Sequence, residues 1–152
     1  MNCHLISTDI GRLLLCAEND TLVRIERLPD DTDSPSDDCT CPVLIEAERQ
    51  LKEYICGERN SFDLPIKIAG TPFQMQVLDA VSKIPYGETR SYGQLCESIG
   101  NPKAARALGS AIHRNPLPLI IPCHRVIAAN GKLGGFVWGT DVKRRLLQLE
   151  RQ

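Results

Sequence analysis

The chain of 152 residues contains 42% hydrophobic, 24% charged and 5% aromatic residues, a composition typical of one globular domain or two small ones. It excludes collagen-like and broadly disordered proteins. No run approaches the roughly 20 apolar residues that span a bilayer, and the amino terminus lacks the basic flank and apolar stretch of a signal peptide. We therefore expect a soluble, intracellular protein without membrane contact.

Seven cysteines, an odd number, are spread along the chain without the spacing of a disulfide framework. This pattern predicts reduced thiols in a reducing compartment and makes a disulfide scaffold the weaker interpretation. Cys39 and Cys41 form a C-x-C pair, which is either a metal-binding pair or an inert part of a loop.

Charge divides the chain into an acidic and a basic half. Residues 1–70 hold 7 Lys and Arg against 14 Asp and Glu, whereas residues 71–152 hold 11 against 5. A basic module attached to an acidic one suits a polyanionic partner for the basic half alone, because phosphate contacts are local. Chance segregation of surface charge is the alternative.

Residues 1–28 read as extended structure. Two β-rich runs are interrupted by turn formers at Asp9–Gly11 and at Glu18–Asp20, which predicts a hairpin or a small sheet. Residues 29–41 are acidic and rich in Ser and Pro. Since this stretch carries too little apolar surface to offset its ordering entropy, it predicts a mobile loop.

A helix follows this loop. Apolar residues recur every three to four positions over residues 42–56, which is the period of an amphipathic helix. Residues 61–70 then read as an extended connector into a second module. We expect an amino-terminal α/β domain over residues 1–69 and a second domain over residues 70–152.

Capping motifs predict where the helices of the second module begin and end. Thr71-Pro72-Phe73-Gln74 and Ser91-Tyr92-Gly93-Gln94 match the capping box, and Gly100 ends the second helix. Asn101-Pro102 predicts an immediate start of the next helix. Two short helices joined by a tight turn are typical of a helix-turn-helix, although helical hairpins without DNA are also common. The fold class is α+β, with a mostly helical second domain.

The second helix of this pair has an almost bare face. Ala105 and Gly109 stand one turn apart beside Arg106. Such a face is able to lie against a nucleic-acid backbone. Alternatively, the small residues only permit close helix packing, and Arg106 is a solvated charge.

A proline-stiffened apolar segment, 115–122, leads directly into Cys123 and His124. If Pro122 occupies the first position of a helix, the helix dipole favours a Cys123 thiolate, and His124 is placed to accept its proton. The alternative is a buried cysteine beside an unrelated histidine. Near the carboxyl terminus, Glu150 follows Leu146 by four residues, on the face marked by apolar residues of the last helix (Val142, Leu146 and Leu149). A carboxylate on this edge requires a buried partner, unless it is simply exposed at the end of the helix.

These stretches together resemble the O6-alkylguanine-DNA alkyltransferases. The resemblance is carried by GTPFQMQVLDAVSKIPYGETRSYGQL, IGNPKAARALGSAIHRNP, LPLIIPCHRVI and the tail NGKLGGF…G…VKRRLLQLE, in the family's order and spacing. They span residues 70–150, slightly more than half of the chain. The first 69 residues resemble only the weakly patterned amino-terminal domain of the family.

The resemblance implies a single-turnover repair protein. It implies binding to double-stranded DNA by the helix-turn-helix in the minor groove, rotation of the damaged base out of the stack, and irreversible alkyl transfer to Cys123. His124 is implied as the water-mediated base and Glu150 as the carboxylate that orients it. No cofactor is expected. The expected lesion is O6-alkylguanine, with O4-alkylthymine as a second candidate, and the expected protein is a monomer, cytoplasmic in a prokaryote and nuclear in a eukaryote.

Further roles follow from the same resemblance, position by position. Arg106 resembles the finger that fills the gap left by the flipped base. Tyr92 resembles the tyrosine that crowds the phosphate and donates a hydrogen bond to guanine, and Asn115 the asparagine that braces the active-site turn. The remaining implied contacts are DNA-backbone contacts at Gly93, Asn101 and Ala105, and pocket positions at Pro118, Val126, Phe136, Val137 and Trp138.

Two departures from the family pattern stand out. Where many members have a tyrosine and then two small residues, this chain has Phe136-Val137-Trp138, which implies a narrower alkyl pocket unless Trp138 turns outward. His4 is the only histidine before His113, so the two-cysteine, two-histidine zinc set of some members is incomplete and no metal is expected. A non-catalytic lesion-binding module and a cysteine hydrolase are the alternatives; Cys123 disfavours the first, and the helix-turn-helix disfavours the second.

Overall fold

The structure, a computed structural model, describes residues 1–31 and 39–151. It divides into two compact units, Met1–Ile68 and Ala69–Gln152, and confirms the predicted α+β class. Most of the predicted acidic loop, residues 32–38, lies outside the described residues. In the part of the chain that is described, no helix is long and apolar enough to cross a membrane.

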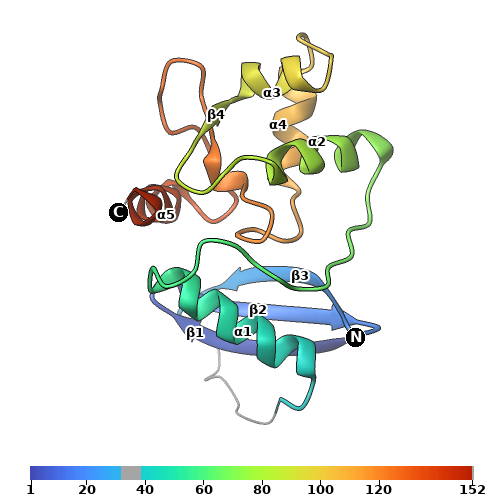
Figure 1. Ribbon diagram of the computed structural model, residues 1–152, viewed down its shortest axis with the longest axis vertical. Coiled ribbons are helices and arrows are strands. Elements are labelled where there is room, and N and C mark those ends of the chain that lie inside the picture. Colours follow the sequence, from blue (N-terminus) through green and yellow to red (C-terminus); the bar gives the residue numbers. More distant parts are fainter. Residues whose placement is uncertain (32–38, 152) are drawn as a thin grey trace. The chain divides into compact units, whose positions relative to one another are not determined.

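The first unit is built on an antiparallel sheet of three strands in the order β1-β2-β3 (Figure 1). The strands are β1 (Asn2–Thr8), β2 (Gly11–Glu18) and β3 (Thr21–Leu28). The two-residue turn between β2 and β3 places Asn19 and Asp20 at φ values of 50° and 62°. Asn and Asp tolerate this left-handed conformation, which matches the twist of a hairpin. Both turn signals are therefore used, and the two expected runs become three strands.

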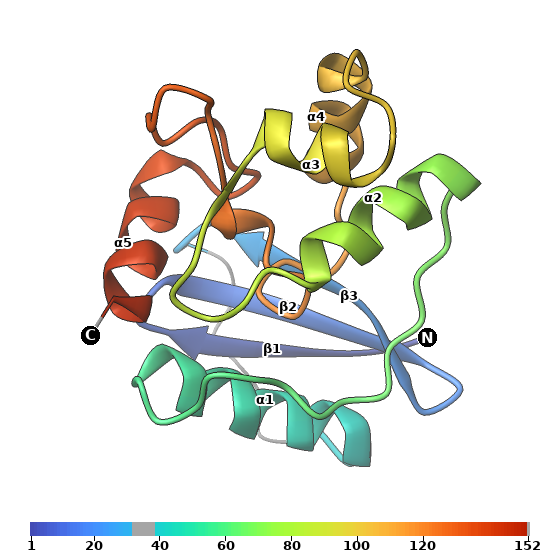
Figure 2. The ribbon, with the colours of Figure 1, turned by 45° about the horizontal axis from the view of Figure 1, so that its top comes forward.

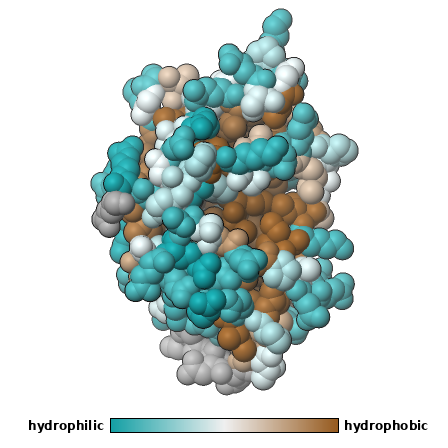
Figure 3. Space-filling view, in the orientation of Figure 1, coloured by the Kyte–Doolittle hydropathy of each residue, from teal (hydrophilic) through white to brown (hydrophobic). Residues whose placement is uncertain are grey.

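Helix α1 (Pro42–Ile55) lies across one face of this sheet (Figures 1 and 2). Pro42 occupies the start of the helix, where its missing N–H costs nothing. The side chains turned to the sheet recur at helical spacing, and the outward face is mostly hydrophilic (Figure 3). The buried residues of α1 are Val43, Leu44, Ala47, Gln50, Leu51 and Tyr54.

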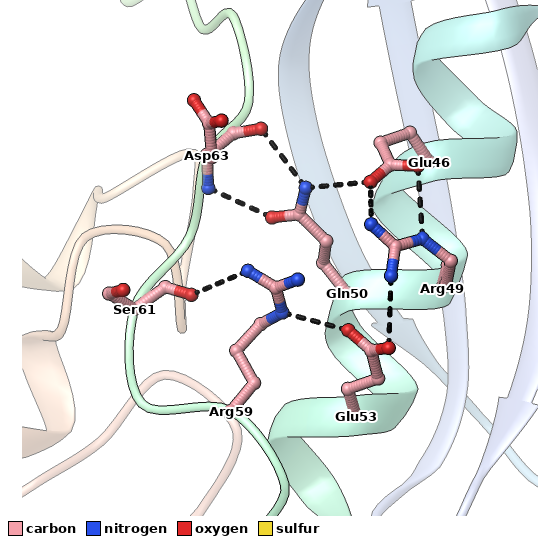
Figure 4. A network of polar contacts seen from close by, with 7 residues as sticks. All are labelled: Glu46, Arg49, Gln50, Glu53, Arg59, Ser61 and Asp63. Atoms are coloured by element: carbon pink, nitrogen blue, oxygen red, sulfur yellow. Dashed lines mark hydrogen bonds and ion pairs between the residues drawn. The ribbon is translucent and has the colours of Figure 1, made fainter.

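Polar contacts tie the segment after α1 back onto the helix (Figure 4). The Gln50 side chain donates to the Asp63 carbonyl at 3.0 Å and accepts from the Asp63 N–H at 2.9 Å, which imitates a strand pairing. Arg59 bonds the Glu53 carboxylate at 2.9 Å and the Ser61 carbonyl at 3.1 Å. A buried Gln is stable here because both ends of its amide are satisfied.

One disulfide corrects the expectation of reduced thiols throughout. Cys3 and Cys16 form a disulfide and are direct partners on β1 and β2, with 4.2 Å between their Cα atoms. Strand register, and not the spacing of cysteines along the chain, brings the two residues together. The free cysteines of the described residues are Cys39, Cys41, Cys56, Cys96 and Cys123.

The second unit groups three helices, α2 (Pro72–Ser82), α3 (Tyr92–Ser98) and α4 (Ala105–His113), which lie side by side in Figure 2. A short parallel pair, β4 (Arg90–Ser91) with β5 (Val126–Ile127), links the start of α3 to the segment after Cys123. The last helix, α5 (Thr140–Glu150), packs against the turn that contains Cys123.

The helix caps agree with the sequence only in part. Ser91 forms the complete capping box with Gln94. Thr71 caps α2 through the Gln74 N–H, but the Gln74 side chain turns away to the Arg114 carbonyl, so the second half of that box is absent. The expected helix start at Asn101-Pro102 is wrong, because residues 102 and 103 form a turn, closed by the hydrogen bond from the Ala104 N–H to the Asn101 carbonyl, and α4 begins at Ala105. This turn connects the two helices of the helix-turn-helix.

Candidate active site

The segment before Cys123 is braced by Asn115. The buried Asn115 side chain donates to the Ile121 carbonyl at 2.9 Å and accepts from the Leu117 N–H at 3.0 Å. Between these contacts Leu119 is buried at a φ of 77°, a left-handed conformation that a leucine rarely adopts. Such a backbone persists only where surrounding contacts hold it, and Asn115 provides two of them.

Cys123 lies in a single 3₁₀ turn, Cys123–Arg125, and is only 3% exposed. Pro122 is the residue that precedes this turn, so the expectation that Pro122 opens a helix whose dipole favours a thiolate is wrong. Burial raises the pKa of the Cys123 thiol to about 11, although a hydrogen bond from Asn115 and the charge of Lys143 oppose this increase. Cys123 is therefore a thiol at neutral pH.

His124 and Glu150 form a fully buried pair. The Nε2 atom of His124 lies 2.7 Å from Oε2 of Glu150, and both side chains are almost completely removed from solvent. Burial lowers the pKa of His124, while the hydrogen bond and charge of Glu150 raise it in part. The His124 imidazole is therefore neutral, with its proton on Nε2, which faces the Glu150 carboxylate. In this tautomer Nδ1 is the basic nitrogen of the ring.

Arg125 completes the surroundings of Glu150, and sequence reasoning missed it. Its Nε and Nη2 atoms donate to both carboxylate oxygens at 2.8 and 3.0 Å, and Nη1 donates to the Ile84 carbonyl at 2.7 Å. The guanidinium lies 5.6 Å from the centre of the Tyr86 ring. The sequence does contain a signal for a buried Arg125, because this charged residue lies inside the apolar run IIPCHRVI, where an exposed position is unexpected.

Lys143 is the second residue that sequence reasoning missed. The predicted inner face of α5 is only partly correct, because Val142 and Leu149 are half-buried, and the buried positions include Lys143. Its Nζ donates to the Val126 carbonyl at 2.6 Å and the Gly135 carbonyl at 3.0 Å. Burial lowers the pKa of Lys143 to about 8. The sequence signal for Lys143 is its position seven residues before Glu150, which is two helical turns and therefore the same face of the helix.

The residues expected around the base lie near these groups. Tyr92 is half-buried, and its pKa is raised by burial and by the proximity of Cys123. The Phe136 ring packs edge-on against His124, with 6.4 Å between ring centres, and Trp138 packs against Phe136 at 6.0 Å. Pro118 is buried and Val137 is exposed, whereas the Val126 carbonyl faces Lys143.

The residues expected to contact DNA lie instead on the surface of the helix-turn-helix. Gly93, Asn101, Ala105 and Arg106 are all exposed. A side chain added at Gly109 would meet open space, so the bare face of α4 is not used for close packing within the described chain. This observation removes the alternative that the small residues serve helix packing.

A hollow of about 470 Å³ lies elsewhere on the second unit, between α2 and α3, with Gln76, Lys83 and Ser98 in its lining. None of the residues expected to contact the base lines it. Among residues 1–31 and 39–151, no group of three or more metal-ligating side chains comes together.

The fold and the site define a protein of two units in which a helix-turn-helix unit carries a buried cysteine beside a histidine–glutamate pair. Two family models match the chain: the 6-O-methylguanine DNA methyltransferase DNA binding domain over residues 72–152, and the ribonuclease-like domain of the same proteins over residues 1–68. The chain belongs to the methylated-DNA–protein-cysteine methyltransferase family.

Individual relatives agree with this assignment. The constitutive methylated-DNA–protein-cysteine methyltransferase of Bacillus subtilis is 42% identical over 95% of this chain and 92% of its own. The Methanosarcina acetivorans enzyme is 56% identical over 69% of this chain and 67% of its own. A crystal structure of Mycobacterium tuberculosis OGT in complex with DNA superposes with a TM-score of 0.86 and 41% identity, covering 97% of this chain and 91% of that one.

Proposed function

We propose that this protein repairs alkylated DNA by transferring the alkyl group from O6 of guanine to Sγ of Cys123. Membership of the methyltransferase family supports the reaction class. The observation that carries the assignment to Cys123 is its place next to His124 of the buried His124–Glu150 pair; a hydrogen bond from Asn115 and the charge of Lys143 also act to lower the pKa of its thiol. Cys96, the other buried free cysteine of this unit, lies in helix α3.

The transfer is a displacement at the alkyl carbon. The Cys123 sulfur forms a bond to that carbon while the bond from carbon to the guanine oxygen breaks. Because the thiol is protonated at rest, its proton passes to Nδ1 of His124, directly or through a water molecule, and the guanine anion that leaves takes up one proton on its ring, returned from His124 through solvent. The Tyr92 hydroxyl is proposed to donate a hydrogen bond to the ring of the leaving guanine. The carbon–sulfur bond of a thioether is stable to water, so each molecule is expected to react once.

The expected partner is double-stranded DNA that bears O6-alkylguanine, and O4-alkylthymine is a second substrate to test. The base must leave the stack, because Cys123 is buried and the substituent lies inside the duplex. Arg106 is proposed to fill the vacated space, with Gly93, Asn101 and Ala105 at the DNA backbone. A bare, exposed helix face supports a close approach to phosphates. The protein is expected to act as a monomer, in the compartment that holds the chromosome.

Mass spectrometry after incubation with a duplex that contains one O6-methylguanine tests the proposal. The peptide that contains Cys123 should gain the mass of one methyl group and keep it. Cys123→Ser should abolish the gain while leaving DNA affinity nearly unchanged, because a hydroxyl fills a similar volume but ionises far less readily. Cys96→Ser is the matched control and should react like the original protein. Methyl mass on another peptide, or none at all with bound DNA, contradicts the assignment.

A further inference from the structure

Arg125 is fixed by more contacts than the arginine of a solvent-exposed salt bridge. Its guanidinium donates two parallel hydrogen bonds to Glu150 and a third to the Ile84 carbonyl, and it lies over the Tyr86 ring. The residue is 7% exposed. A lysine is unable to reproduce this planar fork. Both the planar shape and the charge of arginine therefore matter at this position.

The two oxygens of Glu150 are shared between Arg125 and the histidine. Oε2 accepts from Nη2 of Arg125 and lies 2.7 Å from Nε2 of His124. Oε1 accepts from Nε of Arg125 and, at 3.3 Å, from the Gly87 N–H. Because the cation balances the carboxylate, Glu150 has less capacity to stabilise a second positive charge on the ring.

We propose that Arg125 is a positioning residue that keeps the His124–Glu150 pair at one shared proton, carried on Nε2, so that Nδ1 of His124 is ready to take the thiol proton. The inference rests on the proposed function of Cys123. Without the cation, the buried pair takes up a second proton at neutral pH. If that proton goes to the ring, His124 becomes an imidazolium. If it goes to Glu150, the acid donates to Nε2 and moves the ring proton to Nδ1, and the base is lost in either case.

The charges around His124 agree with this role. Burial is the largest cause of its lowered pKa, the Glu150 hydrogen bond and charge oppose it, and the charges of Arg125 and Lys143 lower it further. Cys123 adds no charge at neutral pH, because its own pKa is raised to about 11. Tyr86, which lies under the guanidinium, is also neutral, since burial and the charge of Glu150 raise its pKa.

The test compares Arg125→Gln with the original protein in two measurements. The rate of methyl transfer is measured against pH, and the protonation of the His124 ring is followed by NMR of the nitrogen-labelled side chain. In Arg125→Gln, the pH at which transfer is lost on acidification should rise by at least about one unit, so transfer at a pH below this transition should fall about tenfold or more, with recovery at higher pH. The NMR titration should move in the same direction.

Controls separate this role from a structural one. Arg144→Gln removes an exposed arginine of α5 and should change neither measurement. The double variant Arg125→Gln with Glu150→Gln removes both charges, so its pair should no longer take up the extra proton. A rate that falls equally at every pH, or a His124 ring that titrates as in the original protein, overturns the proposal. If Arg125→Gln fails to fold, Arg125→Lys takes its place, because lysine keeps the charge and removes only the forked geometry. Loss of transfer in Arg125→Lys with an unchanged His124 titration would then overturn the proposal.

The two proposals fail in different ways. If Cys123 were not the acceptor, the original protein would carry no methyl group there, whereas the His124 titration would still report on Arg125. If Arg125 had no influence on the pair, methyl transfer to Cys123 would persist without any displacement of its pH dependence in the variant.

Discussion

Replacing Asn115 by alanine removes the brace of the active-site turn. The Leu117 N–H and the Ile121 carbonyl lose their partner inside the protein. A buried polar group left without a partner costs about 1–3 kcal/mol, so two of them predict a loss of roughly 2–6 kcal/mol in the free energy of unfolding. The left-handed Leu119 between them gives the turn a further reason to rearrange when the brace is lost.

Urea denaturation followed by tryptophan fluorescence measures this loss selectively. Trp138 is the single tryptophan of the chain, and it lies in the second unit, so its signal reports on the unit that contains Asn115. The matched control is Asn130→Ala, which removes one exposed hydrogen bond to the Lys132 N–H and should change the free energy by less than about 0.5 kcal/mol.

The same variant has a chemical consequence at Cys123. The Asn115 hydrogen bond lowers the pKa of the thiol, so Asn115→Ala should raise it further and slow the alkylation of Cys123 by iodoacetamide, followed on the Cys123 peptide. A destabilisation of less than about 1 kcal/mol with unchanged alkylation would refute the reasoning that Asn115 braces the turn and contacts the sulfur.

Three further perturbations address the DNA surface, the pocket and the buried lysine. Arg106→Ala should reduce transfer from duplex DNA by about tenfold or more, a free-energy difference of about 1.4 kcal/mol, yet leave reaction with a free O6-alkylguanine base unchanged; Lys103→Ala is the exposed control, and an equal loss on both substrates would mean that Arg106 supports the fold. Trp138→Gly should raise inactivation by O6-benzylguanine much more than the rate on methylated DNA, and an unchanged ratio of the two rates would refute occlusion of the pocket by the indole. The folded-state pKa of Lys143, about 8, lies below its ordinary value of 10.5, so the folded protein binds fewer protons there than the unfolded chain between these values, and stability rises with pH. Relative to Lys143→Met, the original protein should therefore gain up to about 3 kcal/mol between pH 8 and 10.5 in urea denaturation, and a constant difference across that range would contradict the burial of an ionisable amine.

Local signals in the sequence determined much of the fold. The Ser91 capping box and the turn formers at Asn19-Asp20 act over a few residues, and the structure contains both. The period of apolar residues over 42–56 likewise predicted α1, because helical burial repeats at a fixed spacing. The segment around Cys123 and His124 carried the family resemblance, which the family models confirm.

Long-range contacts decided what local signals were unable to predict. The Gln74 side chain had two possible partners, and tertiary packing selected the Arg114 carbonyl over the capping box. Register on the sheet, and not sequence spacing, joined Cys3 to Cys16. The start of α4 at Ala105 depends on the connection that follows α3, where a turn at residues 102 and 103 replaces the predicted helix start at the proline.

The protonation of the site is the clearest case of this division. From the sequence, Pro122 is expected to open a helix whose dipole favours a Cys123 thiolate, and no role is assigned to Arg125 or Lys143. Burial reverses the expectation for Cys123, because removing a group from water penalises its charged form and only the folded chain determines which groups are buried. The residue types at the site are thus readable from the sequence, whereas their charge states depend on burial and on partners distant in the sequence, as in the contact of His124 with Glu150, 26 residues away.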